Sequence, residues 1–191
     1  MKALLALVWL LFATAVPAAD YKIGEKLVPA KSTAATKARE IGWDDLMPPG
    51  WNPAKELKAL DLDRLDDADP RAMEVLARLK QMWANAPSNP GITGQSIRLP
   101  GFIVPLEYGK KEVSEFLLVP YFGACIHVPP PPANQIIHVL PAKPVKLRSY
   151  MDAVWVEGQL ELANVKTDMG DAGYRLHAVK VEPYVEKKPR Q

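Results

Sequence analysis

The chain contains one cysteine, and it lies two residues before a histidine. Cys125 and His127 belong to the stretch GACIHVPPPPANQ, residues 123–135. A thiolate sulfur and an imidazole nitrogen are both good zinc ligands, with bond lengths of about 2.3 and 2.0 Å. A thiol next to an imidazole can also be a cysteine nucleophile with its base. These two residues therefore define the candidate site.

Extended backbone would allow Cys125 and His127 to act together, because side chains two apart on a strand share one face, about 6.6 Å apart along the chain. Val128 precedes a proline, which favours extended geometry. The proline run favours a stiff polyproline II segment that would hold the pair in place. We expect Asn134 and Gln135 to donate to carbonyl groups that the prolines leave unpaired. The four prolines are Pro129, Pro130, Pro131 and Pro132.

Three interpretations of the pair stay open. It is a buried structural cysteine with a hydrogen-bonded histidine, a metal site, or a thiol catalyst in which Asn134 orients His127. A closed zinc site needs four ligands, so His138 and His177 are further candidates. Oxygen ligands could come from Glu107, Glu115 and Asp171. No C-x-x-C, G-x-S-x-G or H-E-x-x-H motif is present, so no motif favours an enzyme.

The first 19 residues have the pattern of a secretory signal peptide. Lys2 provides a positive start, residues 4–16 are apolar but too short for a comfortable membrane span, and small residues precede a cleavage site after Ala18 or Ala19. We therefore expect export to the periplasm and no transmembrane span in the mature chain. No cysteine lies near the cut, so we expect no lipid anchor there.

Export makes the lone thiol unusual. A single cysteine cannot form an internal disulfide, and exported proteins meet an oxidising environment. Cys125 is therefore expected to be buried, metal-bound, paired with another protein or catalytic. The chain has 24 basic and 22 acidic residues, of which only Lys2 lies in the signal peptide. Such a balance gives no electrostatic basis for nucleic-acid binding.

Alternating apolar residues after Gly91 predict several short strands. Glycine and proline residues separate them, which favours a mainly β, α+β fold built on a small OB-like barrel of five or six strands. A kink is expected at Pro100 and Gly101, and a break at Gly158. The predicted strands are residues 97–106, 113–119, 135–140, 145–147, 153–165 and 174–184.

One helix is predicted before the barrel. Asp69 would cap it, Pro70 would fit its first turn, and residues 85–91 would end it. Its apolar face, at spacings of three and four, comprises Met73, Leu76, Leu79 and Trp83. Further upstream, the residues expected to dock on the main domain are Trp43, Leu46, Met47 and Trp51. The predicted division is a signal peptide at 1–19, an N-terminal extended and helical segment packed on the barrel at 20–90, the barrel at 91–186 and a tail at 187–191.

The stretch from residue 99 to residue 139, LPGFIVPLEYGKKEVSEFLLVPYFGACIHVPPPPANQIIHV, resembles the DUF3299 family of exported bacterial proteins of undetermined function. The string G-A-C-I-H-x-P-P-P-P-A-N-Q is long and specific, and weaker similarity extends from Trp43 to Tyr184. Cys125 and His127 match the family motif and carry over. His138 does not, because relatives often have an aromatic residue there.

The resemblance implies a periplasmic or lipoprotein location and association with ABC-type export or metal-uptake systems, including zinc-responsive ones. We therefore expect a periplasmic accessory protein that binds a transition metal, zinc, through Cys125 and His127 and delivers it to, or regulates, a transporter. The expected partner is an inner-membrane ABC transporter or a periplasmic metal-binding protein. The first alternative is a non-metal interaction module that docks on an ABC-type transporter through the proline-rich loop. The second alternative is a thiol-dependent enzyme.

Overall fold

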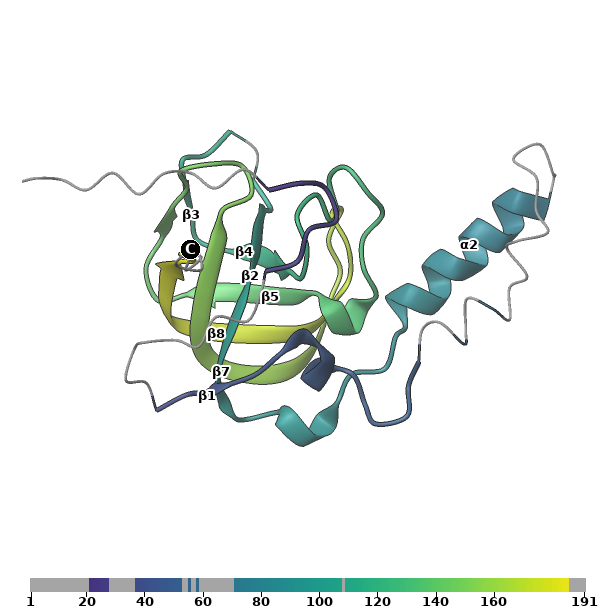
Figure 1. Ribbon diagram of the computed structural model, residues 1–191, viewed down its shortest axis with the longest axis horizontal. Coiled ribbons are helices and arrows are strands. Elements are labelled where there is room, and N and C mark those ends of the chain that lie inside the picture. The colour runs from purple at the N-terminus through teal and green to yellow at the C-terminus, as the bar shows by residue number, and fades with distance from the viewer. Residues whose placement is uncertain are drawn as a thin grey trace, which may run out of the picture.

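Five strands close into a β-barrel in the computed structural model of the chain (Figure 1). The structure describes residues 21–27, 37–52, 55, 58, 71–107 and 109–185. The barrel order is β2-β4-β5-β8-β7, and pairing between β2 and β7 closes it. The strands are β2 (Ser96–Pro105), β4 (Phe116–Val119), β5 (Ile137–Pro141), β7 (Ala153–Val165) and β8 (Ala172–Pro183).

In this barrel β5 and β8 run parallel, and all other neighbouring strands run antiparallel. These strand directions agree with an OB-type barrel. The predicted mainly β, α+β fold with a small barrel is confirmed. Two short additions lie outside the barrel. β1 (Arg39–Glu40) pairs in parallel with the start of β2, and β3 (Glu112–Val113) forms a separate two-stranded sheet with β6 (Val145–Lys146).

The continuous strand β2 pairs with two neighbours along its length. Residues 96–102 pair with β7 and residues 102–105 pair with β4. Gly101 lies at the change-over, where a Cβ atom would come within 2.8 Å of Leu118 Cγ and 2.9 Å of the Val119 carbonyl oxygen. The close approach therefore requires glycine. The kink expected at Pro100 and Gly101 stays a prediction, because β2 runs through both residues as one strand without a register shift.

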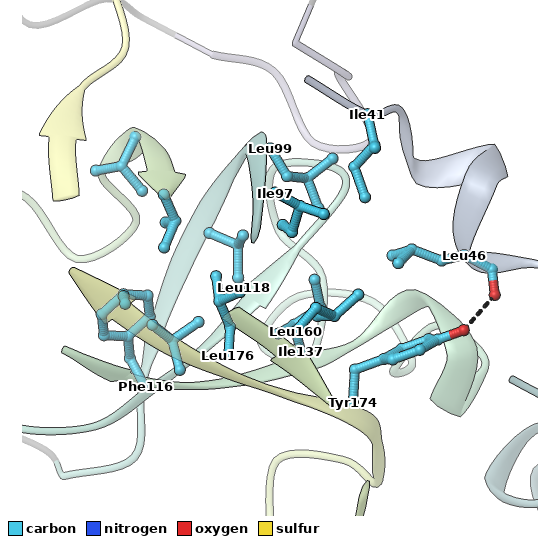
Figure 2. Packing of buried hydrophobic residues seen from close by; sticks show 14 of the residues in the cluster. Ile41, Leu46, Ile97, Leu99, Phe116, Leu118, Ile137, Leu160, Tyr174 and Leu176 are labelled. Atoms are coloured by element: carbon cyan, nitrogen blue, oxygen red, sulfur yellow. Dashed lines mark hydrogen bonds between the residues drawn. The ribbon is translucent and has the colours of Figure 1, made fainter. Parts of the chain in front are cut away.

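Apolar side chains fill the barrel interior (Figure 2). Their alternation along each strand points every second side chain inward. Tyr174 carries its ring into this core, and its hydroxyl donates to the Leu46 carbonyl oxygen at 2.6 Å, which attaches the N-terminal segment to the barrel. The fully buried core residues include Ile97, Leu99, Ile103, Phe116, Leu118, Ile137, Leu160, Tyr174 and Leu176.

A second apolar cluster lies on the outer surface of the barrel. It forms because several strand residues whose side chains point outward are also large and apolar. Phe102 is fully buried there and makes edge contacts with Tyr21 and Phe122, at ring-centroid distances of 5.0 and 5.7 Å. Cys125 packs against the same cluster. This outer cluster therefore supports the loop that carries the candidate site.

The N-terminal segment docks through η1 (Trp43–Leu46), as predicted for two of its four apolar residues. Leu46 is fully buried, and Trp43 Nε1 donates to the Pro100 carbonyl oxygen at 2.8 Å. Helix α2 (Arg71–Ala84) is the predicted helix, but it has no buried residue and extends away from the barrel in Figure 1. Within the described ranges, no helix is both long and apolar enough to cross a membrane.

Two predicted strands differ from the observed ones. The strand predicted at 113–119 is divided into β3 and β4, because each part pairs with a different sheet. The strand predicted at 135–140 starts at Ile137, because residues 133–135 form the 3-10 turn η4 (Ala133–Gln135). Several predictions lie outside the described residues: the signal peptide, the helix start at Asp69 and Pro70, and the tail at 187–191.

Candidate functional site

Cys125 and His127 lie in a tight turn between β4 and β5, so the predicted strand geometry is wrong. The N–H groups of residues 126, 127 and 128 all approach the carbonyl oxygen of Gly123, at 3.3, 2.8 and 3.2 Å. Ala124 and Val128 also bridge to each other. The chain reverses because the backbone of Gly123 has φ +89. We call residues 121–132 the site loop.

Cys125 itself has left-handed backbone, with φ 65, and it is the one non-glycine residue with positive φ within the part of the chain that the structure describes. For a residue with a Cβ atom this conformation costs roughly 1–2 kcal/mol. Strained backbone of this kind persists where the surroundings impose it, and it concentrates at functional sites. The strain therefore marks the turn as a constrained feature of the fold.

The first part of the site loop is fixed by contacts with the N-terminal segment. The N–H of Gly24 donates to the Phe122 carbonyl oxygen at 2.8 Å, and the N–H of Phe122 donates to the Glu25 carbonyl oxygen at 2.9 Å. Met151 adds a third contact, with its sulfur 3.2 Å from the backbone nitrogen of Gly123. The turn is therefore attached to two segments that are remote in sequence.

The Cys125 thiol is partly covered by the outer cluster. Burial raises its pKa to about 12, so the thiol is neutral at physiological pH. Tyr121 lies beside it: burial, and then the charge that Cys125 would carry as a thiolate, raise the pKa of the Tyr121 hydroxyl. The local environment therefore disfavours the thiolate that a nucleophile or a metal ligand requires.

His127 differs from Cys125 in being exposed. Its ring makes no hydrogen bond or ion pair with another described residue. No group of three or more histidine, cysteine, aspartate or glutamate side chains that could hold a metal occurs among the described residues. Within that part of the chain, the site loop offers two ligands to an ion.

The other two histidines have carboxylate partners of their own. His138 is buried on β5, with Nε2 2.8 Å from Glu115 Oε2 and Nδ1 3.5 Å from Arg175 Nε. His177 on β8 lies 3.2 Å from Glu161 Oε1. Neither is brought to Cys125 as an additional ligand. Two proposed oxygen ligands are also paired elsewhere, Glu107 with Lys110 and Asp171 with Lys166.

The four prolines divide between surface and interior. Pro129 and Pro130 are exposed, Pro131 is buried and Pro132 is partly buried. The backbone of Pro132 has φ −53 and ψ 149, close to polyproline II geometry, as the sequence predicts. The first two prolines therefore extend the exposed surface that begins at His127, while the last two anchor it.

Asn134 and Gln135 hold the end of the site loop. Asn134 is fully buried and its Nδ2 donates to the Pro87 carbonyl oxygen at 2.7 Å. Gln135 Nε2 donates to the Trp43 carbonyl oxygen at 2.9 Å. Both amides donate to carbonyl groups as predicted, but the acceptors that fix the loop belong to the N-terminal segment and not to the proline run. The reason is that η4 turns both side chains toward that segment.

Sequence reasoning missed the residues that surround the thiol. Tyr121 lies four residues before Cys125 and Met151 lies 26 after it, and neither belongs to a chemical motif. The aromatic pair Tyr121-Phe122 next to a glycine was the one local signal for a packed turn. Met151 lies just before β7, so its contact with Gly123 depends on the position of β7 in the barrel. No local sequence pattern predicts this contact.

No curated protein matches the chain. Among solved structures, it is similar to the crystal structure of a DUF3299 family protein from Pseudomonas aeruginosa PAO1, with 39% sequence identity and a TM-score of 0.62. The match covers 80% of this chain and 100% of that one. The model of a family described as a protein of unknown function, DUF3299, matches residues 43–183, which include the docked N-terminal segment, the whole barrel and the site loop. The chain therefore belongs to the DUF3299 family.

Proposed function

We propose that this protein is a periplasmic accessory protein that docks on a component of a transport system through its site loop. The observation that carries the proposal is the exposed row formed by His127, Pro129 and Pro130 on a backbone that is hydrogen-bonded at both ends. A surface that is ordered before binding loses little conformational entropy on binding, and this favours affinity.

The chemistry of this row indicates the kind of partner surface. Proline lacks a backbone N–H, and a polyproline II segment is recognised through its side chains and carbonyl groups by grooves lined with aromatic residues. His127 adds a hydrogen-bonding group at one end of the row. A partner with an aromatic groove and a nearby carboxylate or carbonyl oxygen would complement it.

Photo-crosslinking in cells tests the docking proposal. A photoreactive residue at position 129 should crosslink to a transport-system component that mass spectrometry identifies, and the same residue at exposed Pro49 should not. The double variant Pro129→Ser/Pro130→Ser should lower capture of that component at least tenfold, while Pro49→Ser leaves it unchanged. Equal capture by the double variant, at an unchanged melting temperature, would contradict the proposal.

Zinc binding through Cys125 and His127 is the second candidate function. Its support is that a free thiol and an exposed imidazole share one tight turn. Two protein ligands would leave open coordination positions, which suits transfer of the ion better than storage. Because zinc must displace the thiol proton and burial raises the pKa of Cys125, binding should be weak at neutral pH and strengthen as the pH rises.

Equilibrium dialysis with zinc at pH 7 and pH 9 tests this second candidate. The wild-type protein should bind more zinc at the higher pH, and both Cys125→Ser and His127→Ala should lose that increment. Negligible or equal binding by all three proteins excludes a site at this pair. The docking proposal does not depend on the result, because crosslinking at position 129 requires no metal.

The raised pKa of Cys125 also bears on the thiol-enzyme alternative. A thiol with a pKa of about 12 has roughly a thousandth of the thiolate of an ordinary cysteine at neutral pH. Iodoacetamide should therefore label Cys125 slowly in the folded protein and rapidly in urea. Rapid labelling of the folded protein would restore this alternative.

A further inference from the structure

A cleft of about 440 Å³ lies between residues 141–148 and the end of β8. It is at the opposite end of the barrel from the site loop, because that loop joins the end of β4 to the start of β5, whereas the cleft adjoins the ends of β5 and β8. Its volume is within the range of ligand-binding clefts. The apolar lining residues include Pro141, Pro144, Val145, Val154, Val181 and Pro183.

One wall of the cleft is an unpaired strand edge. The parallel pairing of β5 with β8 ends at Pro141 and Ala178, whereas β8 continues to Pro183 with β7 on its other side. Across the cleft, no backbone hydrogen bond joins residues 179–183 to residues 143–148, both of which are described throughout. The last residues of β8 therefore present an open edge that another strand could use.

The rim of the cleft carries more positive than negative side chains. Its basic residues are Lys143, Lys146, Arg148 and Lys180, and its acidic residues are Asp152 and Glu182. Both carboxylates are already engaged. Asp152 accepts the Arg148 backbone N–H at 2.7 Å, and Glu182 lies 2.7 Å from Lys180 Nζ and 3.2 Å from Arg98.

The remaining positive charge is available to a ligand. Lys143 is exposed and has no ion-pair partner among the described residues. Lys146 is 83% exposed and lies 3.6 Å from Glu112, a distance at which an exposed pair contributes little. The rim therefore complements a negatively charged occupant.

We propose that this cleft binds an extended, acidic segment of a partner protein, which adds as a strand to the open edge of β8. Strand addition would satisfy the free backbone groups of residues 179–183, and alternate side chains of the added segment would meet the apolar lining. Its carboxylates would lie near Lys143 and Lys146, the basic residues of the rim that are not already held by a rim carboxylate. The protein's own last residues, EKKPRQ, are mainly basic and do not complement this rim.

The lysine and the β-bulge at the open edge of β8 could also serve to prevent aggregation. Lysine side chains and a β-bulge protect exposed strand edges from aggregation, and β8 has Lys180 next to a bulge at Val179, where Gly158 pairs with Ala178 and Glu157 with Lys180. Protection alone explains the lysines without a ligand. It does not explain a cleft with apolar lining residues beside the edge, and it predicts that no acidic strand binds.

Fluorescence anisotropy with labelled ten-residue peptides tests the proposal on the purified protein. The probe alternates valine with glutamate, and the control peptide alternates valine with lysine. We expect saturable binding of the acidic probe, at least tenfold weaker binding of the basic control, and weakening of the acidic probe at 0.5 M salt. No binding of the acidic probe at millimolar protein, or equal binding of both peptides, overturns the proposal.

Matched variants test the position. Lys143→Glu/Lys146→Glu should weaken the acidic probe at least tenfold, while Lys22→Glu/Lys37→Glu makes the same charge change at exposed residues outside the cleft and should weaken it less than threefold. Equal weakening by both pairs would show attraction by net charge only and would reject the cleft.

Two further probes test the binding mode. The acidic peptide with N-methyl groups on alternate residues cannot form a complete ladder, so it should bind at least fivefold more weakly; equal binding rejects strand addition. Citrate tests a small-anion site. If citrate competes with an affinity equal to that of the peptide, the cleft recognises small anions and the partner-segment proposal fails.

Discussion

The two ends of the barrel differ in how their backbone and charges are satisfied. At the site-loop end, three N–H groups converge on Gly123, buried Asn134 fixes the chain after the prolines, and the exposed row is uncharged apart from one histidine. At the cleft end, the edge of β8 is unpaired and the basic residues outnumber the acidic ones. The backbone of the site loop is closed by hydrogen bonds, whereas the cleft has an open strand edge beside an excess of basic residues.

This difference indicates two kinds of recognition. A hydrogen-bonded loop presents one preformed surface, so its specificity depends on shape. An open strand edge offers backbone groups to any extended chain, so its specificity depends on the charges beside it. Mutations should therefore affect stability at the site-loop end and binding at the cleft end, and the following predictions test that division in order of expected effect.

Phe102→Ala should have the largest effect on stability. The ring is fully buried under the site loop and contacts Tyr21 and Phe122, so its loss leaves a cavity in the outer cluster. We expect the free energy of unfolding to fall by about 3–5 kcal/mol, measured by urea denaturation. A loss below about 1 kcal/mol would show that the outer cluster does not support this end.

Asn134→Ala should destabilise the protein by about 1–2 kcal/mol, because it removes the hydrogen bond to the Pro87 carbonyl oxygen. Gln159→Ala is the matched control, since its exposed amide lies 3.5 Å from the Gly94 carbonyl oxygen and contributes little. Urea denaturation of both variants measures the difference. Equal losses of unfolding free energy in the two variants would show that Asn134 does not stabilise the site loop.

The thiol should give the site-loop end a pH dependence at alkaline pH. Burial raises the pKa of Cys125 from 9.0 to about 12, so between these values the unfolded chain loses a proton that the folded chain keeps. The contribution of this group to the free energy of unfolding is therefore fully present below about pH 9 and decreases as the pH rises toward 12. Over this range the free energy of unfolding should fall by less than about 1.4 kcal/mol per pH unit.

Comparison with Cys125→Ala isolates this contribution from the other groups that titrate at alkaline pH. The difference in unfolding free energy between wild type and variant should become smaller from pH 8 to pH 10. A constant difference over that range would mean that the folded thiol ionises as easily as the unfolded one.

Val179→Ala should have the smallest effect, a change in unfolding free energy within about 0.5 kcal/mol. Val179 is 72% exposed at the cleft end and lies at the bulge of β8, so the barrel core does not depend on it. Thermal or urea unfolding checks this. A loss comparable with that of Phe102→Ala would show that both ends are equally packed, and the distinction between them would fail.

Local patterns predicted the long barrel strands and failed at the short elements. The alternation in β2, β7 and β8 is visible because inward residues such as Leu99, Leu160 and Leu176 occur among polar ones or turn residues. β4 has four residues, and all of them are apolar, so no alternation between polar and apolar residues is visible in it. Its separation from β3 depends on pairing with β6, which lies more than 30 residues away.

The backbone geometry of the candidate site was predicted wrongly, and the role of Cys125 and His127 stays a prediction. C-x-H followed by prolines is compatible with extended backbone, so a strand was the simplest expectation. The left-handed backbone of Cys125 depends instead on contacts of its neighbours with the N-terminal segment and Met151. These contacts join residues far apart in sequence, and no local preference encodes them.

The sequence by itself determined the fold class, the barrel strands that alternate clearly and the family to which the chain belongs. These follow from side-chain period, turn residues and a specific motif, all of which are local. Tertiary structure alone decided that Cys125 is partly covered with a raised pKa, that two of the four prolines face outward, and that β8 outlasts β5 to leave an open edge. Burial, exposure and the end of a strand pairing are properties of neighbours in space, so they are settled only when the barrel closes.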